Sequence, residues 1–92
     1  MARYSRLTVL NAMVDTGLVP VFYNGDVDVA IEVVKACAAG GSRLVEFTNR
    51  GDLAYQVFCE LVKYVEEADL DVILGVGSVI DAPTAGLYVA SG

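Results

Sequence analysis

The sequence predicts an α/β fold in which parallel strands alternate with amphipathic helices. Short, continuous apolar runs, typical of strands buried on both faces, alternate with longer segments whose apolar residues recur at helical spacing. The strand starts are about 25 to 30 residues apart, a spacing that suits right-handed crossover connections. The expected order is one leading helix and then three strand–helix units. This order fits a doubly wound sheet or part of a barrel, and periodicity alone does not choose between them.

The leading helix is expected over residues 3–15 and stops at Gly17. The first strand is expected over residues 18–23, an unbroken apolar run of the kind buried on both faces. Pro20 has no N–H group, so it fits only an early or tolerant position in that strand.

The remaining expected elements are a helix over 27–39, a strand over 44–48, a helix over 53–69, a strand over 72–76 and a helix over 82–91. Asp26, Asp52 and Asp81 stand directly before the three helices, where a carboxylate accepts hydrogen bonds from the first N–H groups. Gly40–Gly41 stops the first of these helices, and Gly77–Ser78 turns the chain after the last strand.

The composition narrows the classes of function. The chain has 12 acidic and 6 basic residues, a net charge of −6, and no histidine. A negative surface argues against nucleic acid, whose binding depends on clustered Lys and Arg. Without histidine there is no Ser-His or Cys-His nucleophile pair, and the commonest transition-metal ligand is missing. We expect neither a metal nor a cofactor, and we expect Cys37 and Cys59 to be reduced and packed in helices.

Two further expectations concern location and completeness. No apolar run approaches the roughly 20 residues that span a bilayer, so a cytoplasmic location is expected and a membrane partner is not. Three parallel strands cannot close a barrel, and the third would leave an apolar edge unpaired. We therefore expect residues 1–92 to be the incomplete N-terminal part of one larger domain, prone to form oligomers or to fold marginally.

Glu46 is the most unusual residue of the expected strands. It interrupts a buried apolar run, and alternation places it on the same face as Thr48 and opposite Phe47. A carboxylate on an inner face is paired, hydrogen-bonded or functional, because burying it bare costs several kcal/mol. The two hypotheses are a proton shuttle and a structural ion pair with Arg50 or Arg43.

Other candidate groups lie at the expected strand ends, where functional loops converge in parallel α/β folds. Arg50 can bind a carboxylate with two hydrogen bonds, or it is a solvated loop charge. The Gly75–Ser78 segment resembles a phosphate-binding turn, although a lone G-x-G is weak support; the alternative is close backbone approach with the Ser78 hydroxyl facing the pocket. Lys35 and Lys63 lie in helical patterns and are expected to face solvent.

Three segments in register carry a resemblance to a known family. They are residues 17–21 (Gly-Leu-Val-Pro-Val), 39–50 (Ala-Gly-Gly-Ser-Arg-Leu-Val-Glu-Phe-Thr-Asn-Arg) and 75–79 (Gly-Val-Gly-Ser-Val). Together they resemble the 2-keto-3-deoxy-6-phosphogluconate (KDPG) and 4-hydroxy-2-oxoglutarate (KHG) aldolases, which are class I, Schiff-base TIM barrels. The similarity covers all 92 residues in order and spacing, and the E-x-T-x-R element is its most specific part.

The resemblance implies roles for individual residues. Glu46 would be the general acid/base in the cleavage of a 2-keto acid to pyruvate and an aldehyde, and Arg50 would bind the substrate carboxylate. Thr48 and Ser78 would contribute hydroxyl groups to the pocket, Ser78 at a position where the family usually has Thr. Asn49-Arg50-Gly51 departs from the family's commoner Leu-Arg-Thr, which leaves open how the far end of the substrate is held. The full-length enzyme would be a cytoplasmic trimer.

The resemblance also implies that essential parts lie outside this sequence. The family's Schiff-base lysine is on strand six, and its phosphate-binding loops follow strands seven and eight. We therefore expect the full-length protein to be an aldolase and the 92-residue chain to be inactive. Whether the substrate carries a phosphate depends on those same parts.

Two alternatives from other classes remain. A flavodoxin-like or Rossmann-like domain would bind a nucleotide or phosphate at the G-x-G segment, and it predicts a glycine-rich turn after the first strand. The sequence there is Tyr23-Asn24-Gly25-Asp26, with one glycine and an aspartate that repels phosphate. The other alternative is a non-catalytic, engineered partial barrel that associates through its open strand edges.

Overall fold

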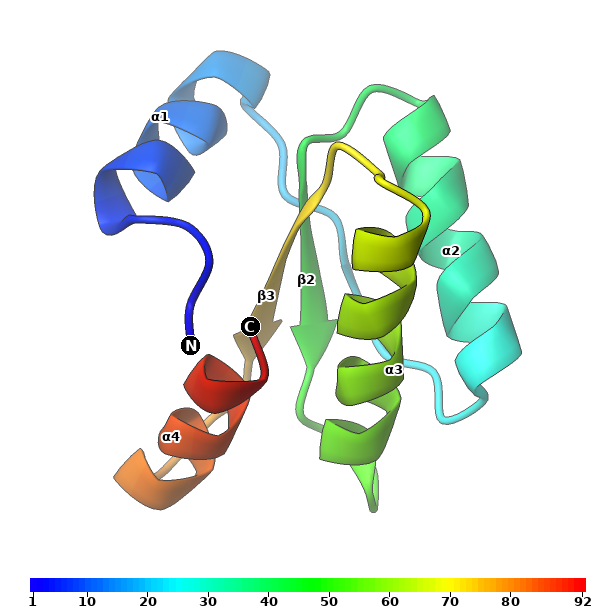
Figure 1. Cartoon of the computed structure of the whole chain (residues 1–92), viewed down its shortest axis with the longest axis vertical. Helices are drawn as coiled ribbons and strands as arrows, with labels where there is room; N and C mark the ends of the chain where they lie inside the picture. The colour runs from blue at the N-terminus through cyan, green and yellow to red at the C-terminus, as the bar shows by residue number, and fades with distance from the viewer.

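The computed structural model describes residues 1–92 and contains four helices and a three-stranded parallel sheet (Figure 1). The elements are α1 (Arg6–Thr16), β1 (Val21–Phe22), α2 (Val27–Ala39), β2 (Leu44–Thr48), α3 (Ala54–Glu67), β3 (Ile73–Gly77) and α4 (Ala82–Ser91). The predicted α/β class and the order of a leading helix and three strand–helix units are confirmed. No helix combines the length and the apolar character needed to cross a membrane.

The sheet has the order β1-β2-β3, so β2 is its central strand. Glu46 pairs with Val21 on one side and with Gly75 on the other, and Thr48 pairs with Gly77. Partners in a parallel register point to the same face, and successive residues alternate between faces. We call the face that carries Glu46 and its register partners the inner face, and the opposite face the outer face.

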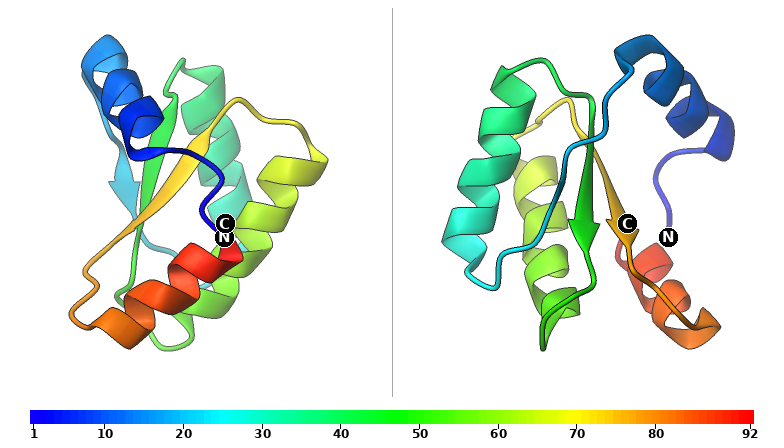
Figure 2. Two further views of the ribbon diagram at one scale, coloured as in Figure 1. Left: turned by 60° about the vertical axis from the view of Figure 1, so that its left-hand side comes forward. Right: turned by 180° about the vertical axis from the view of Figure 1, so that it is seen from behind.

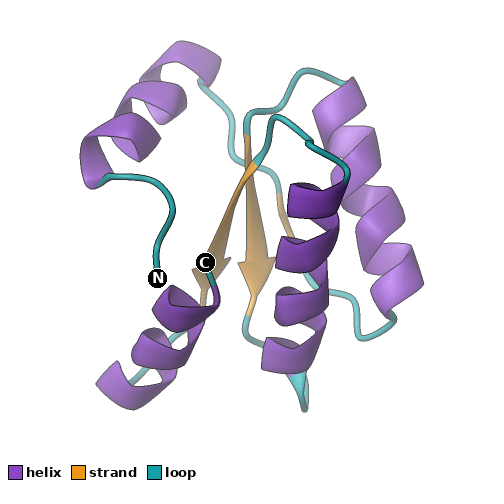
Figure 3. Ribbon diagram, viewed as in Figure 1, coloured by secondary structure: helices purple, strands orange, loops and turns teal.

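The outer face is covered by α2 and α3 (Figure 3). Phe47 lies at the centre of this core with no exposed surface, and its ring contacts those of Phe22, Tyr23 and Phe58 at centroid distances of 5.5, 5.6 and 6.2 Å. The other members of the cluster are Ala30, Val34, Val45, Ala54, Val57, Phe58, Leu61, Val62, Val65, Val72 and Tyr88. The buried side of α3, which includes Val57, Leu61 and Val65, is therefore the face of that helix that packs against the sheet.

The inner face is covered only at the starts of the strands. There, Ala12 of α1 packs with Leu44 and Ile73 in a small second cluster. Beyond that cluster no helix lies over the strands, and Figure 2 shows the face between α1 at one end of the sheet and α4 at the other. The helix α4 packs instead against α3, where Tyr88 stacks edge-on against Tyr55 and Phe58.

Three of the expected helix ends are confirmed. Asp26 Oδ1 accepts hydrogen bonds from the N–H groups of Asp28 and Val29, and Asp81 accepts two from Thr84, one from its N–H and one from its hydroxyl. The hydrogen bonds from Thr84 lower the pKa of Asp81, because they favour its charged form. Gly17 ends α1 in the left-handed conformation, with φ of 70°.

Three expectations about local structure are wrong. The first strand covers only Val21–Phe22, because Pro20 has no N–H group for the ladder, and Val21 is 57% exposed rather than buried. Asp52 does not cap α3; Leu53 takes the N-cap position at φ of 60° without a side-chain hydrogen bond. The third strand lies one residue later than expected and includes Gly77, because Gly77 O accepts a hydrogen bond from Asn49 N.

Candidate functional site

Glu46 lies on the inner face, at the middle of the central strand. It is half-buried, while both of its neighbours in sequence, Val45 and Phe47, are buried in the core on the outer face. The alternation of β2 thus directs the Glu46 carboxylate away from the helices α2 and α3, as the sequence predicted. This placement leaves the carboxylate on the part of the sheet that no helix covers.

Two glycines of β3 provide the surface beside Glu46. A Cβ atom on Gly77 would lie 1.9 Å from Glu46 Oε1 and 2.8 Å from its Cδ, so the carboxyl group occupies the space over Gly77. A Cβ atom on Gly75 would meet nothing within 4 Å. Gly77 therefore allows the Glu46 side chain to extend toward the strand ends, and Gly75 leaves open space next to it.

The Glu46 carboxylate has no ionic partner in the chain. The four ion pairs use Glu66, Glu32, Asp71 and Glu60 as their acidic members. Arg43 pairs with Asp71 at 2.9 Å, and Arg50 belongs to none of the pairs. The hypothesis of a structural ion pair between Glu46 and either arginine is therefore wrong. An unpaired carboxylate next to open space can accept a hydrogen bond from a ligand or act as an acid/base toward it.

Thr48 occupies the next inner-face position toward the strand end. The residue is only 3% exposed, and Thr48 Oγ1 has no hydrogen-bond partner. A buried hydroxyl without a partner is uncommon, because it loses its hydrogen bonds to water and gains none in return. The C-terminal end of β2 thus presents an unpaired carboxylate and an unsatisfied hydroxyl on the same face.

Arg50 and Ser78 lie in the loops that follow β2 and β3. Both are exposed, so each faces solvent at this end of the sheet. The Arg50 N–H donates to Thr48 O at 2.8 Å, which forms a tight turn, and Ser78 has an unusual positive φ of 60°. The structure therefore places both residues at the C-terminal end of the sheet, toward which Glu46 points; we call this end the rim. Neither residue pairs with Glu46.

Asn49 ties the two rim loops together, a role that the sequence did not reveal. Its side-chain amide donates to Ser78 O at 3.5 Å, and Tyr88 Oη donates to Asn49 Oδ1 at 2.8 Å. Burial raises the pKa of Tyr88, and the nearby Cys59 adds to the shift. The loop that carries Arg50 is thus anchored to α4 through a buried tyrosine.

A hollow of about 210 Å³ lies next to Glu46, between α1 and the inner face of the sheet. Val9 and Met13 of α1 form one wall, and Glu46 and Gly75 lie on the opposite wall. Most of the other lining residues are apolar. No group of three or more Cys, Asp or Glu side chains is arranged to hold a metal ion.

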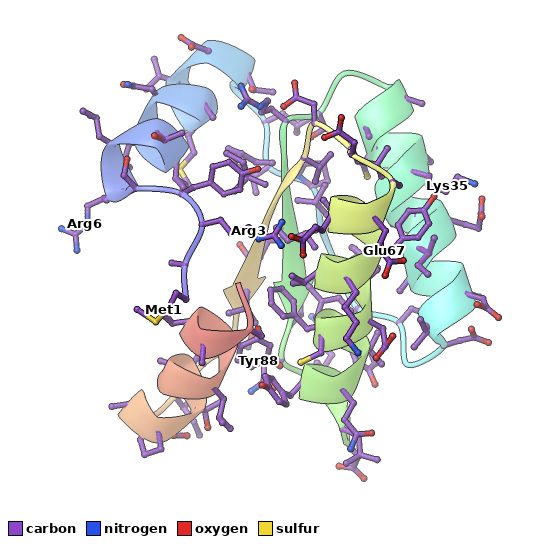
Figure 4. All side chains as sticks on the ribbon, viewed as in Figure 1. Met1, Arg3, Arg6, Lys35, Glu67 and Tyr88 are labelled. Carbon is purple, nitrogen blue, oxygen red and sulfur yellow. The ribbon has the colours of Figure 1, made fainter.

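The two lysines lie far from this rim in the architecture. Lys35 extends from α2 away from the sheet (Figure 4), and Lys63 lies exposed on α3. Each donates to a glutamate three residues earlier, Lys35 to Glu32 at 3.1 Å and Lys63 to Glu60 at 2.8 Å. These hydrogen bonds raise the pKa of both lysines, which disfavours the neutral amine that a nucleophile needs.

No protein family matches the chain. No curated protein matches it significantly either. The geometry around Glu46 and the resemblance carried by three segments of the sequence are therefore the support for a function.

The role of Gly77 was also missed at the level of sequence. The expected strand ended at Val76 and left Gly77 in a turn. A register that places Gly77 opposite Thr48 would have revealed that the glycine and Glu46 share a face. The signal was the spacing of Gly75 and Gly77, which alternate with the apolar Leu74 and Val76.

Proposed function

We propose that residues 1–92 are the N-terminal part of a (β/α)8-barrel class I aldolase that cleaves a 2-keto acid to pyruvate and an aldehyde. The observation that carries the proposal is the unpaired Glu46 carboxylate on the inner face of the central strand, over Gly77. In parallel α/β enzymes the reactive groups lie at the C-terminal ends of strands. The open inner face is also the side that further strands would enclose in a barrel.

In this proposal Glu46 is the acid/base. It takes the proton from the substrate hydroxyl as the carbon–carbon bond breaks, and it returns a proton to the new methyl carbon of pyruvate. An acid/base residue needs space for the substrate beside it, and it must not be held in a permanent ion pair. Glu46 has both, because Gly75 leaves space beside it and no arginine pairs with it.

The rim residues would bind the substrate. Arg50 has an exposed guanidinium without an ion-pair partner, which suits a carboxylate that binds in two hydrogen bonds. Thr48 would add a hydroxyl that has no partner within the chain; because this hydroxyl is buried, a substrate oxygen reaches it only when the residues that cover it move. Ser78 adds a further hydroxyl from the loop after β3.

A Schiff-base aldolase also needs a lysine, whose amine makes the keto carbon an electron acceptor. Lys35 and Lys63 lie on the outer helices and form hydrogen bonds with glutamates. We therefore place the reactive lysine on a later strand of a longer protein. The 92-residue chain then contains the acid/base and the carboxylate-binding group, but not the nucleophile they serve.

The phosphate-binding alternative has less support. Gly75 and Gly77 lie within strand β3 rather than in a loop that surrounds a phosphate. The following helix, α4, begins only after Asp81, whose carboxylate occupies the N-terminal hydrogen-bonding position. A phosphate at that helix end would meet this negative charge.

The test is the effect of Glu46→Gln in the longer protein that we propose, with pyruvate release from 4-hydroxy-2-oxoglutarate as the readout. We expect a loss of about 100- to 10,000-fold in kcat, the usual contribution of a positioned acid/base. The matched control is Glu60→Gln, at an exposed α3 position, which should leave the rate unchanged. A Glu46→Gln enzyme with the unaltered rate would rule out this role for Glu46.

A further inference from the structure

Helix α1 has apolar residues on two sides, but the fold covers only one of them. Ala12 is buried against the sheet and Val9 is half-buried beside it. Leu7, Leu10, Met13 and Val14 are 67%, 48%, 41% and 82% exposed. A surface helix normally has polar residues opposite its buried side. We call these four exposed residues the α1 stripe.

The spacing of the stripe suits another helix. Residues three, four and seven positions apart lie on one face of an α-helix. Leu7, Leu10 and Val14 have the intervals of a coiled-coil seam, in which each apolar side chain fits between side chains of the facing helix. Met13 extends the stripe toward the hollow next to Glu46.

The charges of the chain favour this helix as the site of contact. The chain has a net charge of −6, and α2 and α3 carry exposed acidic and basic residues such as Glu32, Lys35, Glu60 and Lys63. Within α1 the only charges are Arg6 at the start and Asp15 near the end, so the stripe between them is neutral. Figure 4 shows Arg6 at the outer end of α1, pointing away from the body of the molecule.

We propose that the α1 stripe binds the α1 stripe of a second copy, with the two helices antiparallel about a twofold axis. This arrangement puts the Asp15 end of each helix beside the Arg6 end of the other, which opposes unlike charges and aligns the helix dipoles favourably. The two Leu10 side chains meet near the axis, and Val14 of each copy lies opposite Leu7 of the other. The acidic helices α2 and α3 stay remote from the contact. The proposal does not rest on the aldolase function.

The size of the stripe sets the expected strength. Four partly exposed side chains per copy cover well under the roughly 800 Å² per partner of a standard interface. We therefore expect a weak, reversible dimer, with a dissociation constant of about 100 µM.

The test uses sedimentation equilibrium of the 92-residue chain from about 10 µM to about 1 mM. We expect Val14→Glu to raise the dissociation constant at least about tenfold, because it places a carboxylate in the seam of each copy. Val29→Glu is the matched control: Val29 is 44% exposed on α2, and its substitution should leave the dissociation constant unchanged. Circular dichroism of each variant establishes that its helices are intact.

The orientation has its own test. Leu7→Lys should also weaken the dimer, but an equimolar mixture of Leu7→Lys and Val14→Glu chains should associate again, because antiparallel pairing opposes the two new charges. A chain that stays monomeric at about 1 mM would overturn the proposal. So would equal weakening by Val14→Glu and Val29→Glu, or a mixture that does not associate.

Discussion

Replacing Gly77 with alanine should displace the Glu46 carboxyl group while the fold is retained. A Cβ atom at this position would lie 1.9 Å from Glu46 Oε1, so both cannot keep their places. The atoms that must move belong to the end of a flexible side chain, and the backbone of Gly77 has no positive φ that alanine would strain. We therefore expect the substitution to change the position of the Glu46 carboxyl group and to lower activity, with little effect on the stability of the fold.

The measurement is the ¹³C carboxyl resonance of Glu46 in the 92-residue chain, followed by activity in the longer protein. We expect a changed resonance for Gly77→Ala and a fall in kcat of about 100-fold, because a displaced base is poorly aligned with its proton. For the resonance, Gly75→Ala is the control on the same face of the same strand, since its Cβ would meet nothing within 4 Å. If the two variants change the Glu46 resonance equally, the Gly77 contact does not position the carboxylate.

The largest expected effect on stability is that of Phe47→Ala. Phe47 is fully buried and contacts three aromatic rings between the sheet and the helices. Removing such a side chain leaves a cavity and costs about 3–5 kcal/mol, which is most of the total stability of many small domains.

Urea unfolding followed by circular dichroism measures this loss. Tyr4→Ala is an aromatic control at a 39% exposed position, where the loss should be much smaller. If Phe47→Ala lowers the free energy of unfolding by less than about 1 kcal/mol, the centre of the core lies elsewhere.

The sequence predicted most of the fold because its signals were local. The apolar run around Val45 and Phe47 gave β2 its correct bounds, and Asp26 and Asp81 marked helix starts through their own hydrogen bonds. The errors arose where a partner strand decides the structure. β1 covers two residues because Pro20 has no N–H to donate to the ladder, although its carbonyl accepts a hydrogen bond from Glu46 N. Gly77 belongs to β3 because its carbonyl accepts a hydrogen bond from Asn49 N.

Part of the site was also predicted, because the signal for it is local in the sequence. Alternation along β2 placed Glu46 and Thr48 on the inner face without any knowledge of the other strands. The contact of Glu46 with Gly77 depends on the register between β2 and β3, which sequence periodicity does not fix. The bridge from Tyr88 through Asn49 joins residues 39 positions apart, and nothing local in the sequence signals it.

Two surfaces of the chain lack a partner within it. The inner face beyond α1 has no helix over it, and α1 itself presents its apolar stripe to solvent. In the barrel that we propose, further strands cover the inner face; in the dimer that we propose, a second copy covers the α1 stripe.

The most direct test of the proposed function is to trap a Schiff base with pyruvate and borohydride, and to locate the adduct by mass spectrometry. We predict no adduct on the 92-residue chain, because Lys35 and Lys63 are protonated, hydrogen-bonded and on outer helices. In the longer protein we predict one adduct, on a lysine beyond residue 92. An adduct on Lys35 or Lys63, or no adduct in the longer protein, would contradict the assignment of this chain to a Schiff-base aldolase.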